Sequence, residues 1–372
     1  MTGEYASVRT GIVGLGNIGQ HHADRLVDLG VPLVGGMDIE PDARTRFADR
    51  YGVEVYDDYH DLYDAVDAVV ITTPNKFHEE YAVAALERDL HVLLEKPLAH
   101  TIESAERIAD AAATAKGTLK IGFNNRFLNA VKLIRNRAER GEFGEITHIE
   151  ANYVRRRGVP SRGSWFTRRS VSGGGALIDL GVHAIDLSMY LLGYPAVEEV
   201  SGVTRSEFGD RDDYAYLEMW GGDSGPDGFD VDDSASAFVR CAGDRTVSLE
   251  VAWATNRPAT HEFVVRGTKA AARFDLLEGD LTIHSASADG PDHLLDTTIE
   301  TRENDTHTDE QRAFFDAVTT SRDSGGGIED ALTVQRIIDG IYRSSEGGYT
   351  VSLGDGKPDP QGNRERSDYS SH

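Results

Sequence analysis

Short hydrophobic runs and amphipathic segments alternate along the first third of the chain. Apolar runs predict strands at residues 10–13, 32–37, 53–56, 65–72, 91–94 and 119–123. Apolar residues at helical spacing predict helices at residues 20–28, 41–51, 79–88 and 102–116. Regular alternation of strand and helix is typical of a parallel, doubly wound sheet. We therefore expect an α/β domain over residues 1–123.

The pattern changes after residue 123. Alternating apolar and polar positions predict strands at residues 146–154, 236–240, 246–253 and 261–266. This rhythm is typical of a largely antiparallel sheet with one buried face. Helices are predicted at residues 130–140, 176–192, 310–319 and 328–343. We therefore expect an α+β domain over residues 124–353, with an acidic surface insertion at 208–233 and a disordered tail at 354–372.

Composition narrows the possible function classes. The 372 residues include 38 Lys and Arg against 63 Asp and Glu, a net charge of −25 that opposes binding to nucleic acid or an anionic membrane. The single cysteine, Cys241, excludes an internal disulfide and is expected to be an inert strand residue. We expect no metal site.

The same composition bears on where the protein works. No apolar run approaches the roughly 18 to 20 residues of a membrane span, and the N-terminus lacks the pattern of a signal peptide, so we expect a cytoplasmic protein. Many carboxylates with only seven lysines are typical of a salt-accumulating cytoplasm. We therefore expect a halophilic archaeal origin, with an ordinary acidic protein as the alternative.

A glycine-rich turn lies between the first predicted strand and the first predicted helix. In this position glycines let backbone N–H groups approach a pyrophosphate. Asp38 lies at the end of the next strand, where it would bind ribose hydroxyls and repel a 2′-phosphate. We therefore expect NAD as cofactor, while use of NADP stays open. The turn residues expected to contact the cofactor are Gly14, Gly16, Asn17, Ile18 and Gly19.

Two further motifs carry candidate proton-transfer chemistry. Lys96, in Glu95-Lys96-Pro97, follows a predicted strand and would point into the crevice at its carboxyl end. Asp179 and His183 are four residues apart, so on a helix they share a face and the carboxylate would orient the imidazole. Asp186 could compete for the same imidazole. The structural alternatives are a solvated lysine, a helix-capping aspartate and a core histidine.

The order and spacing of these motifs resemble the glucose–fructose oxidoreductase / inositol 2-dehydrogenase superfamily, called Gfo/Idh/MocA. The resemblance covers about residues 9–353. It rests on the glycine turn, Thr72-Thr73-Pro74-Asn75 with His78, Glu95-Lys96-Pro97, Asn125-Arg126-Phe127, and Asp179 with His183. It implies an N-terminal Rossmann domain and a C-terminal α+β domain whose open sheet often mediates oligomers. It also implies oxidation or reduction of sugars and cyclitols with NAD(H) or NADP(H).

The resemblance also implies roles for individual residues. His183 would accept a hydroxyl proton with Asp179 orienting it, and Lys96 would stabilise the alkoxide, although base and electrophile could exchange roles. Further cofactor contacts are expected from Thr73, Pro74, Asn75, His78, Glu95, Lys96 and Asn124. Substrate contacts are expected from Lys96, Arg126, Tyr153, Trp165, Asp179 and His183. The run of arginines at 155–157 is either a ligand contact or a solvated face.

Two other functions remain open at this stage. One is redox-neutral epimerisation or glycoside elimination with tightly held NAD. The other is a sensor that binds NAD and a sugar without catalysis. A homodimer or homotetramer formed through the C-terminal sheet is expected in each case.

Overall fold

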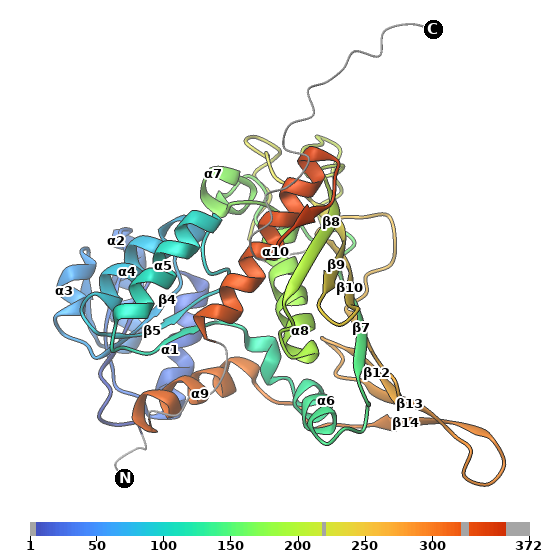
Figure 1. The fold of residues 1–372 in the computed structure, drawn as a ribbon. Coiled ribbons are helices and arrows are strands. Elements are labelled where there is room, and N and C mark those ends of the chain that lie inside the picture. The colour runs from blue at the N-terminus through green and yellow to red at the C-terminus, as the bar shows by residue number, and fades with distance from the viewer. Residues whose placement is uncertain (1–4, 218–220, 321–326, 355–372) are drawn as a thin grey trace, which may run out of the picture.

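The computed structural model describes residues 5–217, 221–320 and 327–354. Figure 1 shows two sheets, with helices α8 and α10 between the helix-covered first sheet and the second. Most of the tail predicted at 354–372 lies outside the described residues.

The first sheet has six parallel strands in the order β3-β2-β1-β4-β5-β6, as the alternating pattern predicts. Its strands are β1 (Thr10–Val13), β2 (Leu33–Met37), β3 (Glu54–Tyr56), β4 (Ala68–Ile71), β5 (His91–Leu94) and β6 (Leu119–Ile121). Its connecting helices are α1 (Asn17–Leu29), α2 (Pro41–Tyr51), α3 (Tyr59–Tyr63), α4 (His78–Leu86) and α5 (Ile102–Thr114), with short 3-10 turns η1 (Asn75–Phe77) and η2 (Asn124–Phe127). The short helix α3 was not predicted.

Both faces of this sheet are buried because successive side chains point to opposite sides. On one face, Ile12 and Val70 pack with residues of α1, α2 and the late helix α9 (Thr306–Thr320). On the other, Val69 and Ile71 pack with residues of α3, α4 and α5. Helix α9, from the C-terminal part of the sequence, therefore completes the helical layer on one face of the first sheet. The predicted division of the chain at residue 123 stays a prediction.

The second sheet has nine strands, of which only the central pair β7 and β10 is parallel. Their order is β14-β13-β12-β11-β7-β10-β9-β8-β15. The strands are β7 (Ile146–Val154), β8 (Val197–Arg205), β9 (Ser234–Cys241), β10 (Arg245–Ala252), β11 (Glu262–Gly267), β12 (Ala270–Asp275), β13 (Leu281–Ser287), β14 (His293–Ile299) and β15 (Val351–Ser352). Sequence patterning missed β8, β12, β13, β14 and β15, and β14 is exposed along nearly its whole length, so no alternation marks it.

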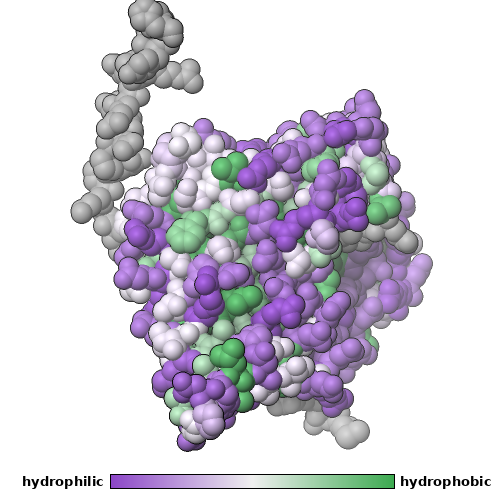
Figure 2. All heavy atoms as spheres, turned by 90° about the vertical axis from the view of Figure 1, so that its right-hand side faces the viewer, coloured by the Kyte–Doolittle hydropathy of each residue, from purple (hydrophilic) through white to green (hydrophobic). Residues whose placement is uncertain are grey.

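Helices cover one face of this second sheet and leave the other open. The cover is formed by α8 (Val182–Leu192) and α10 (Ile328–Gly347), which pack on β7 and β8, respectively. Figure 2 shows the open face, where hydrophobic side chains are scattered among hydrophilic ones. Val203 and Phe238 are about half exposed there. The remaining helices are α6 (Asn129–Glu139), the short α7 (Arg169–Ser172), the 3-10 turn η3 (Trp165–Thr167) and a π-helical turn, η4 (Leu177–Gly181).

The predicted helix at 176–192 is therefore a π-helical turn followed by α8. The stretch Arg169–Leu192 is long and apolar enough to pass for a membrane span, but most of it is buried inside the fold. It is thus a core helix of the second sheet. Cys241 is buried on β9, and burial raises the pKa of its thiol to about 11, as expected for an inert residue.

The acidic segment at 208–233 is more than a surface insertion, because its last two residues are buried. Asp233 accepts hydrogen bonds from the backbone N–H groups of residues 207, 208 and 209. Its own carbonyl accepts from the backbone N–H of Trp253. The segment therefore leaves β8 and returns to β9 through a closed, hydrogen-bonded neck.

Candidate active site

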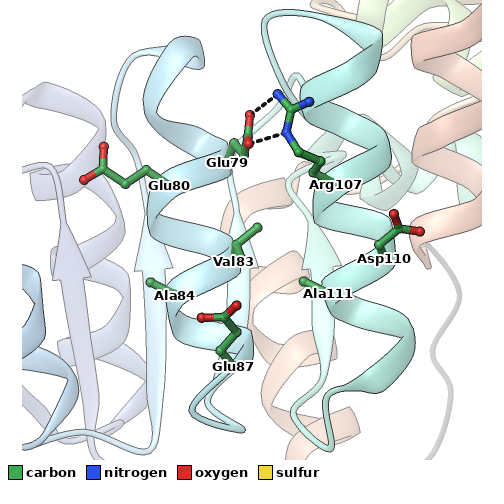
Figure 3. A pocket seen from close by; sticks show the side chains of 8 residues that line it. All are labelled: Glu79, Glu80, Val83, Ala84, Glu87, Arg107, Asp110 and Ala111. Carbon is green, nitrogen blue, oxygen red and sulfur yellow. Dashed lines mark hydrogen bonds and ion pairs between the residues drawn. The ribbon is translucent and has the colours of Figure 1, made fainter.

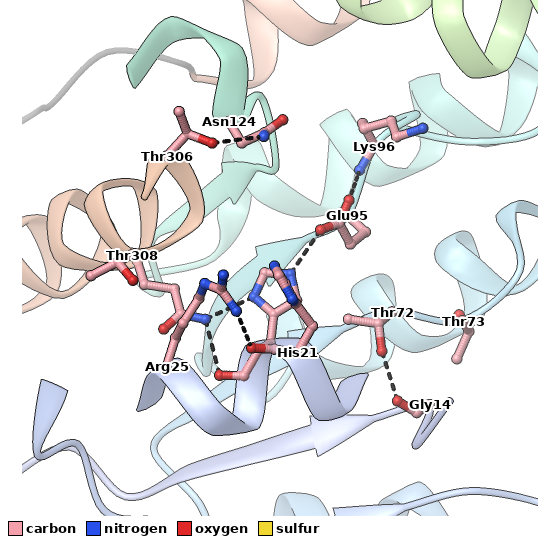
Figure 4. A network of polar contacts seen from close by, with 12 residues as sticks. Gly14, His21, Arg25, Thr72, Thr73, Glu95, Lys96, Asn124, Thr306 and Thr308 are labelled. Atoms are coloured by element: carbon pink, nitrogen blue, oxygen red, sulfur yellow. Dashed lines mark hydrogen bonds and ion pairs between the residues drawn. The ribbon is translucent and has the colours of Figure 1, made fainter. Parts of the chain in front are cut away.

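The glycine turn joins β1 to α1 and is built on close backbone approaches. Gly14 has φ of +93°, and a Cβ there would lie 3.0 Å from the backbone of Thr72. A Cβ on Gly19 would lie 2.0 Å from the carbonyl oxygen of Gly14. The Thr72 hydroxyl donates to that same carbonyl at 2.7 Å (Figure 4). These contacts explain why glycine occupies positions 14 and 19.

Gly16 needs a different explanation, because a Cβ on it would meet nothing within 4 Å. The fold itself thus gives no packing reason for this glycine. Helix α1 starts here without a side-chain cap, and Asn17 and Ile18 are exposed in its first turn. Open space, free of side chains, at a helix N-terminus suits a pyrophosphate. The residues present therefore fit a dinucleotide.

Asp38 follows β2 and holds the glycine turn in place. Its Oδ2 accepts from the backbone N–H of Leu15 at 2.7 Å, and its Oδ1 accepts from that of Glu40 at 2.9 Å. Arg44, on α2, donates to the Asp38 carbonyl at 2.6 Å. The sequence analysis did not identify Arg44. Its positive charge lies beside Asp38, the residue expected to bind the ribose hydroxyls.

The loop after β4 is only partly turned toward this space. Asn75 is buried and donates to the carbonyl of Ser172 at 2.7 Å. The ring nitrogens of buried His78 lie 2.9 Å from the carbonyls of Thr73 and Pro97. Burial lowers the pKa of His78. Both side chains thus tie loops together, and we infer a positioning role instead of the predicted cofactor contact. Pro74 precedes η1, and the hydroxyl of Thr73 is buried without a partner in the described structure.

Lys96 and Asp179 meet although 83 positions separate them. Lys96 Nζ donates to Asp179 Oδ1 at 2.9 Å and to the Asp179 carbonyl at 3.2 Å. Trp253, just after β10, donates from its indole nitrogen to Asp179 Oδ2 at 2.9 Å. Burial raises the pKa of Asp179, but the charges of Lys96 and Arg155 and the hydrogen bonds from Lys96 and Trp253 bring it down to about 2. The carboxylate is therefore ionised and fully held.

The predicted pairing of Asp179 with His183 is wrong. The carboxylate oxygens of Asp179 accept from Lys96 and Trp253, and the buried Nδ1 of His183 makes no hydrogen bond to them. The local winding is a π-turn, so the α-helical spacing argument does not apply. Asp186 does not compete either, because it binds Arg126.

His183 begins α8 beside this pair, and its Nδ1 is buried without a hydrogen-bond partner among the described residues. Burial, followed by the charge of Lys96, lowers the pKa of the imidazole to about 3. The Tyr153 ring centroid lies 6.4 Å from that of His183. At neutral pH the site thus contains a neutral imidazole, an ammonium and a carboxylate, which is the set needed for proton transfer to or from an alcohol.

Comparison with known proteins agrees with this geometry. Residues 8–123 match the model of an oxidoreductase family with an NAD-binding Rossmann fold, and residues 131–273 match the GFO/IDH/MocA C-terminal domain. The chain belongs to this family.

The names of the relatives of this chain describe proteins that act on sugars. It is 28% identical to the D-glucoside 3-dehydrogenase of Escherichia coli, over 93% of this chain and 97% of that protein. It is 36% identical to a putative UDP-kanosamine synthase oxidoreductase subunit of Amycolatopsis mediterranei, over 68% of this chain and 70% of that protein. A levoglucosan dehydrogenase structure with NADH and L-sorbose is 25% identical, with a TM-score of 0.82 over 94% of this chain and 99% of that one.

The turn that carries Asp179 is fixed by three glycines and a buried carboxylate. A Cβ on Gly173, Gly174 or Gly175 would fall about 2 Å or less from the His100 carbonyl, the Tyr342 hydroxyl or the Asp232 carbonyl, respectively. Asp232 accepts from the backbone N–H groups of Gly175 and Leu177, each at 2.8 Å, and from the Tyr342 hydroxyl at 2.7 Å. The end of the acidic segment therefore caps the helix of the site, a role that sequence analysis did not assign.

A second polar network lies beneath Lys96 and reaches α9. Glu95 Oε1 accepts from His22 Nε2 at 2.7 Å, and His22 Nδ1 accepts from Gln311 at 2.8 Å. Burial raises the pKa of Glu95, but the His22 hydrogen bond and nearby positive charges bring it below its ordinary value. Figure 4 shows Glu95 bonded to the backbone of Lys96, and Asn124 donating to Thr306. Glu95 and Asn124 thus anchor the two halves of the molecule at this point.

His307, on α9, joins the edge of this network. Its ring centroid lies 4.7 Å from that of His21. Burial lowers the pKa of His307 to about 4. Within the described ranges no three His, Cys, Asp or Glu side chains group as metal ligands.

Arg126 is held by partners within the protein, and its predicted substrate contact stays a prediction. Its guanidinium is buried and binds Asp186, Asp330 and the hydroxyl of Tyr194. Four of its five N–H donors are thus used within the protein, which leaves one N–H on Nη1. Trp165 stacks on Phe166, with ring centroids 3.8 Å apart, and its predicted substrate contact stays a prediction.

A groove of about 580 Å³ lies elsewhere, between α4 and α5 (Figure 3). Glu79 and Arg107 form an ion pair across it. Half of its eight lining residues are acidic, and it contains none of the predicted site residues. Its lining residues are Glu79, Glu80, Val83, Ala84, Glu87, Arg107, Asp110 and Ala111.

Proposed function

We propose that this protein is an NAD-dependent dehydrogenase that oxidises a secondary or hemiacetal hydroxyl of a sugar or cyclitol. The observation that carries the proposal is the contact of Lys96 with Asp179 at 2.9 Å beside the neutral imidazole of His183. The names of the relatives support a sugar as the substrate.

His183 accepts the hydroxyl proton in this scheme. Its Nδ1 is the buried nitrogen, which leaves Nε2 to receive the proton. The low pKa of the ring, about 3, keeps it unprotonated at neutral pH, so a nitrogen lone pair can accept the hydroxyl proton, although a pKa nearer the working pH would make it a stronger base.

Lys96 stabilises the negative charge that develops on the substrate oxygen. Asp179 anchors Lys96, and Trp253 in turn anchors Asp179. The ammonium is thus fixed before the substrate arrives, so no reorganisation is needed during the reaction. We therefore propose His183 as the base and Lys96 as the electrophile, a choice that the sequence left open.

The cofactor site consists of the glycine turn, the uncapped start of α1, and Asp38. When bound, NAD supplies the carbon that takes the hydride. Gly16 leaves room for the pyrophosphate, and Asp38 lies where it can meet the ribose.

The charge and the exposed sheet face of the protein suggest its cellular environment, its source and its oligomeric state. We propose a cytoplasm rich in salt, a halophilic archaeal source, and a homodimer or homotetramer formed through the open sheet face. The support is the net charge of −25 and the half-exposed Val203 and Phe238 on that face. The same charge argues against nucleic-acid and membrane partners.

The direct test is a panel of aldoses, ketoses, inositols and sugar acids in high KCl, monitored by NADH absorbance. Oxidation of at least one sugar or cyclitol with equimolar NADH formation supports the proposal. Consumption of a sugar without NADH would indicate the redox-neutral alternative. Tight binding of NAD and a sugar without turnover would indicate a sensor.

A further inference from the structure

Arg155 lies at the edge of the proposed site and has no role in the scheme above. It directly follows β7, on which Ile149, Ala151 and Tyr153 face the covering helices. Side chains two residues apart share a face of a strand, so Arg155 continues this row. Its guanidinium carbon lies 5.9 Å from the centroid of the Tyr153 ring.

The neighbouring strand places a further aromatic group in this corner. His261 immediately precedes β11, and its ring centroid lies 5.2 Å from that of Tyr153. Tyr153 therefore lies between His261 and His183 and close to Arg155. The charge of Arg155 also contributes to lowering the pKa of Asp179. Arg155 thus belongs to the same space as the proton-transfer set.

The guanidinium of Arg155 is incompletely satisfied. Its Nη1 is buried without a hydrogen-bond partner, and Arg155 takes part in no ion pair among the described residues. Arg137 and Arg245 also have a buried Nε without a hydrogen-bond partner, but each forms an ion pair with a glutamate. Arg162 binds Asp223 and the carbonyls of residues 209 and 211.

Such a group calls for an explanation, because an unpaired buried donor costs free energy that most proteins avoid. The explanation is not a shortage of acids, since the chain has 63 of them. Asp179, the nearest candidate named above, is already held by Lys96 and Trp253. The donor is therefore free for a ligand that enters beside His183.

We propose that Arg155 binds an oxyanionic substituent of the sugar substrate, either a carboxylate or a phosphate. This inference rests on the proposed dehydrogenase function and specifies its substrate class. The planar guanidinium matches both groups through paired N–H donors. A local cation also offsets the repulsion that a protein of charge −25 exerts on an acidic substrate.

The test compares sugars that differ in the group at C6, namely D-glucose (hydroxymethyl), D-glucuronate (carboxylate) and D-glucose 6-phosphate (phosphate), together with a matching set from the best neutral substrate of the panel. Initial rates give kcat/KM for the wild type, Arg155→Met and Arg155→Lys. Arg156→Met is the matched control, because it removes the same charge from the next, exposed residue.

We expect the wild type to favour one anionic sugar over its neutral counterpart. Arg155→Met should lower kcat/KM for that anion about 10- to 100-fold, mainly through KM, and change the neutral sugar little. Arg155→Lys should recover part of the loss, and Arg156→Met should behave as wild type. The anionic sugar whose kcat/KM falls in Arg155→Met, D-glucuronate or D-glucose 6-phosphate, shows whether Arg155 binds a carboxylate or a phosphate.

Two results would overturn the inference. One is equal use of neutral and anionic sugars by the wild type. The other is an equal loss for both kinds of sugar in Arg155→Met, which would make Arg155 a structural neighbour of Asp179. Failure of every sugar to reduce NAD would instead refute the proposed function, so the two failures are distinguishable.

Discussion

The low pKa of His183 predicts a specific dependence of stability on pH. Its pKa falls from an ordinary 6.5 to about 3 in the folded protein, mainly through burial. As pH falls below 6.5, the unfolded chain binds a proton at this residue and the folded chain does not. The folded state therefore loses stability as pH falls from about 6.5 toward about 3, and this stability is fully present above pH 6.5. Between about pH 7.5 and about pH 5 the loss from this one residue is about 2 kcal/mol.

His183→Asn removes this contribution and keeps a polar side chain of similar shape. Urea unfolding in high KCl at about pH 7.5 and about pH 5 gives the free energy of unfolding of each protein. Wild type should lose about 2 kcal/mol more than His183→Asn over this interval. The substitution of His293, on exposed β14, by Asn controls for the loss of a histidine as such.

The difference between the two proteins isolates His183, because the other titrating groups are common to both. Identical pH dependence in wild type and His183→Asn would refute the reasoning. It would mean that the imidazole has the same pKa in the folded and unfolded chain, so that burial does not lower it.

Three further outcomes follow from the structure. Asp38→Ser should narrow the preference for NAD over NADP in kcat/KM, since Arg44 then remains beside the ribose without the repelling carboxylate; unchanged preference would remove Asp38 from the ribose site. Asp232→Asn should lower the free energy of unfolding by about 1 to 3 kcal/mol, because an amide has one acceptor atom for three buried donors; a stability equal to wild type would refute the capping role. Thermal unfolding should shift upward as KCl rises from millimolar to molar, where the Debye length falls from about 30 Å to about 3 Å; a flat or falling trend would count against the salt-adapted setting.

The parts of the fold that depend on local pattern could be predicted from the sequence. The six parallel strands follow from short apolar runs separated by helical spacing, and the glycine turn follows from its place between β1 and α1. The antiparallel sheet was recognised from the alternation in β7, β10 and β11. Strands such as β14 were missed because exposed strands carry no hydrophobic signal.

The site depended on contacts that no local pattern reveals. Asp179 pairs with Lys96 and Trp253, from three separate segments, so the spacing to His183 was misleading. His78 was assigned to the cofactor by resemblance, but its ring nitrogens are used between two loops. Arg126 likewise has its partner, Asp186, 60 positions away. Single-residue roles of this kind follow from tertiary packing alone.

The central claim is that His183 is the general base of an NAD-dependent sugar dehydrogenase. The most direct measurement is kcat for NADH formation by wild type and His183→Asn with the best substrate, alongside NAD affinity by fluorescence titration. General base catalysis contributes about 10² to 10⁴ in rate, so kcat should fall by that factor while NAD affinity stays nearly unchanged. A near-normal kcat in His183→Asn would contradict the claim and make His183 a structural residue of α8.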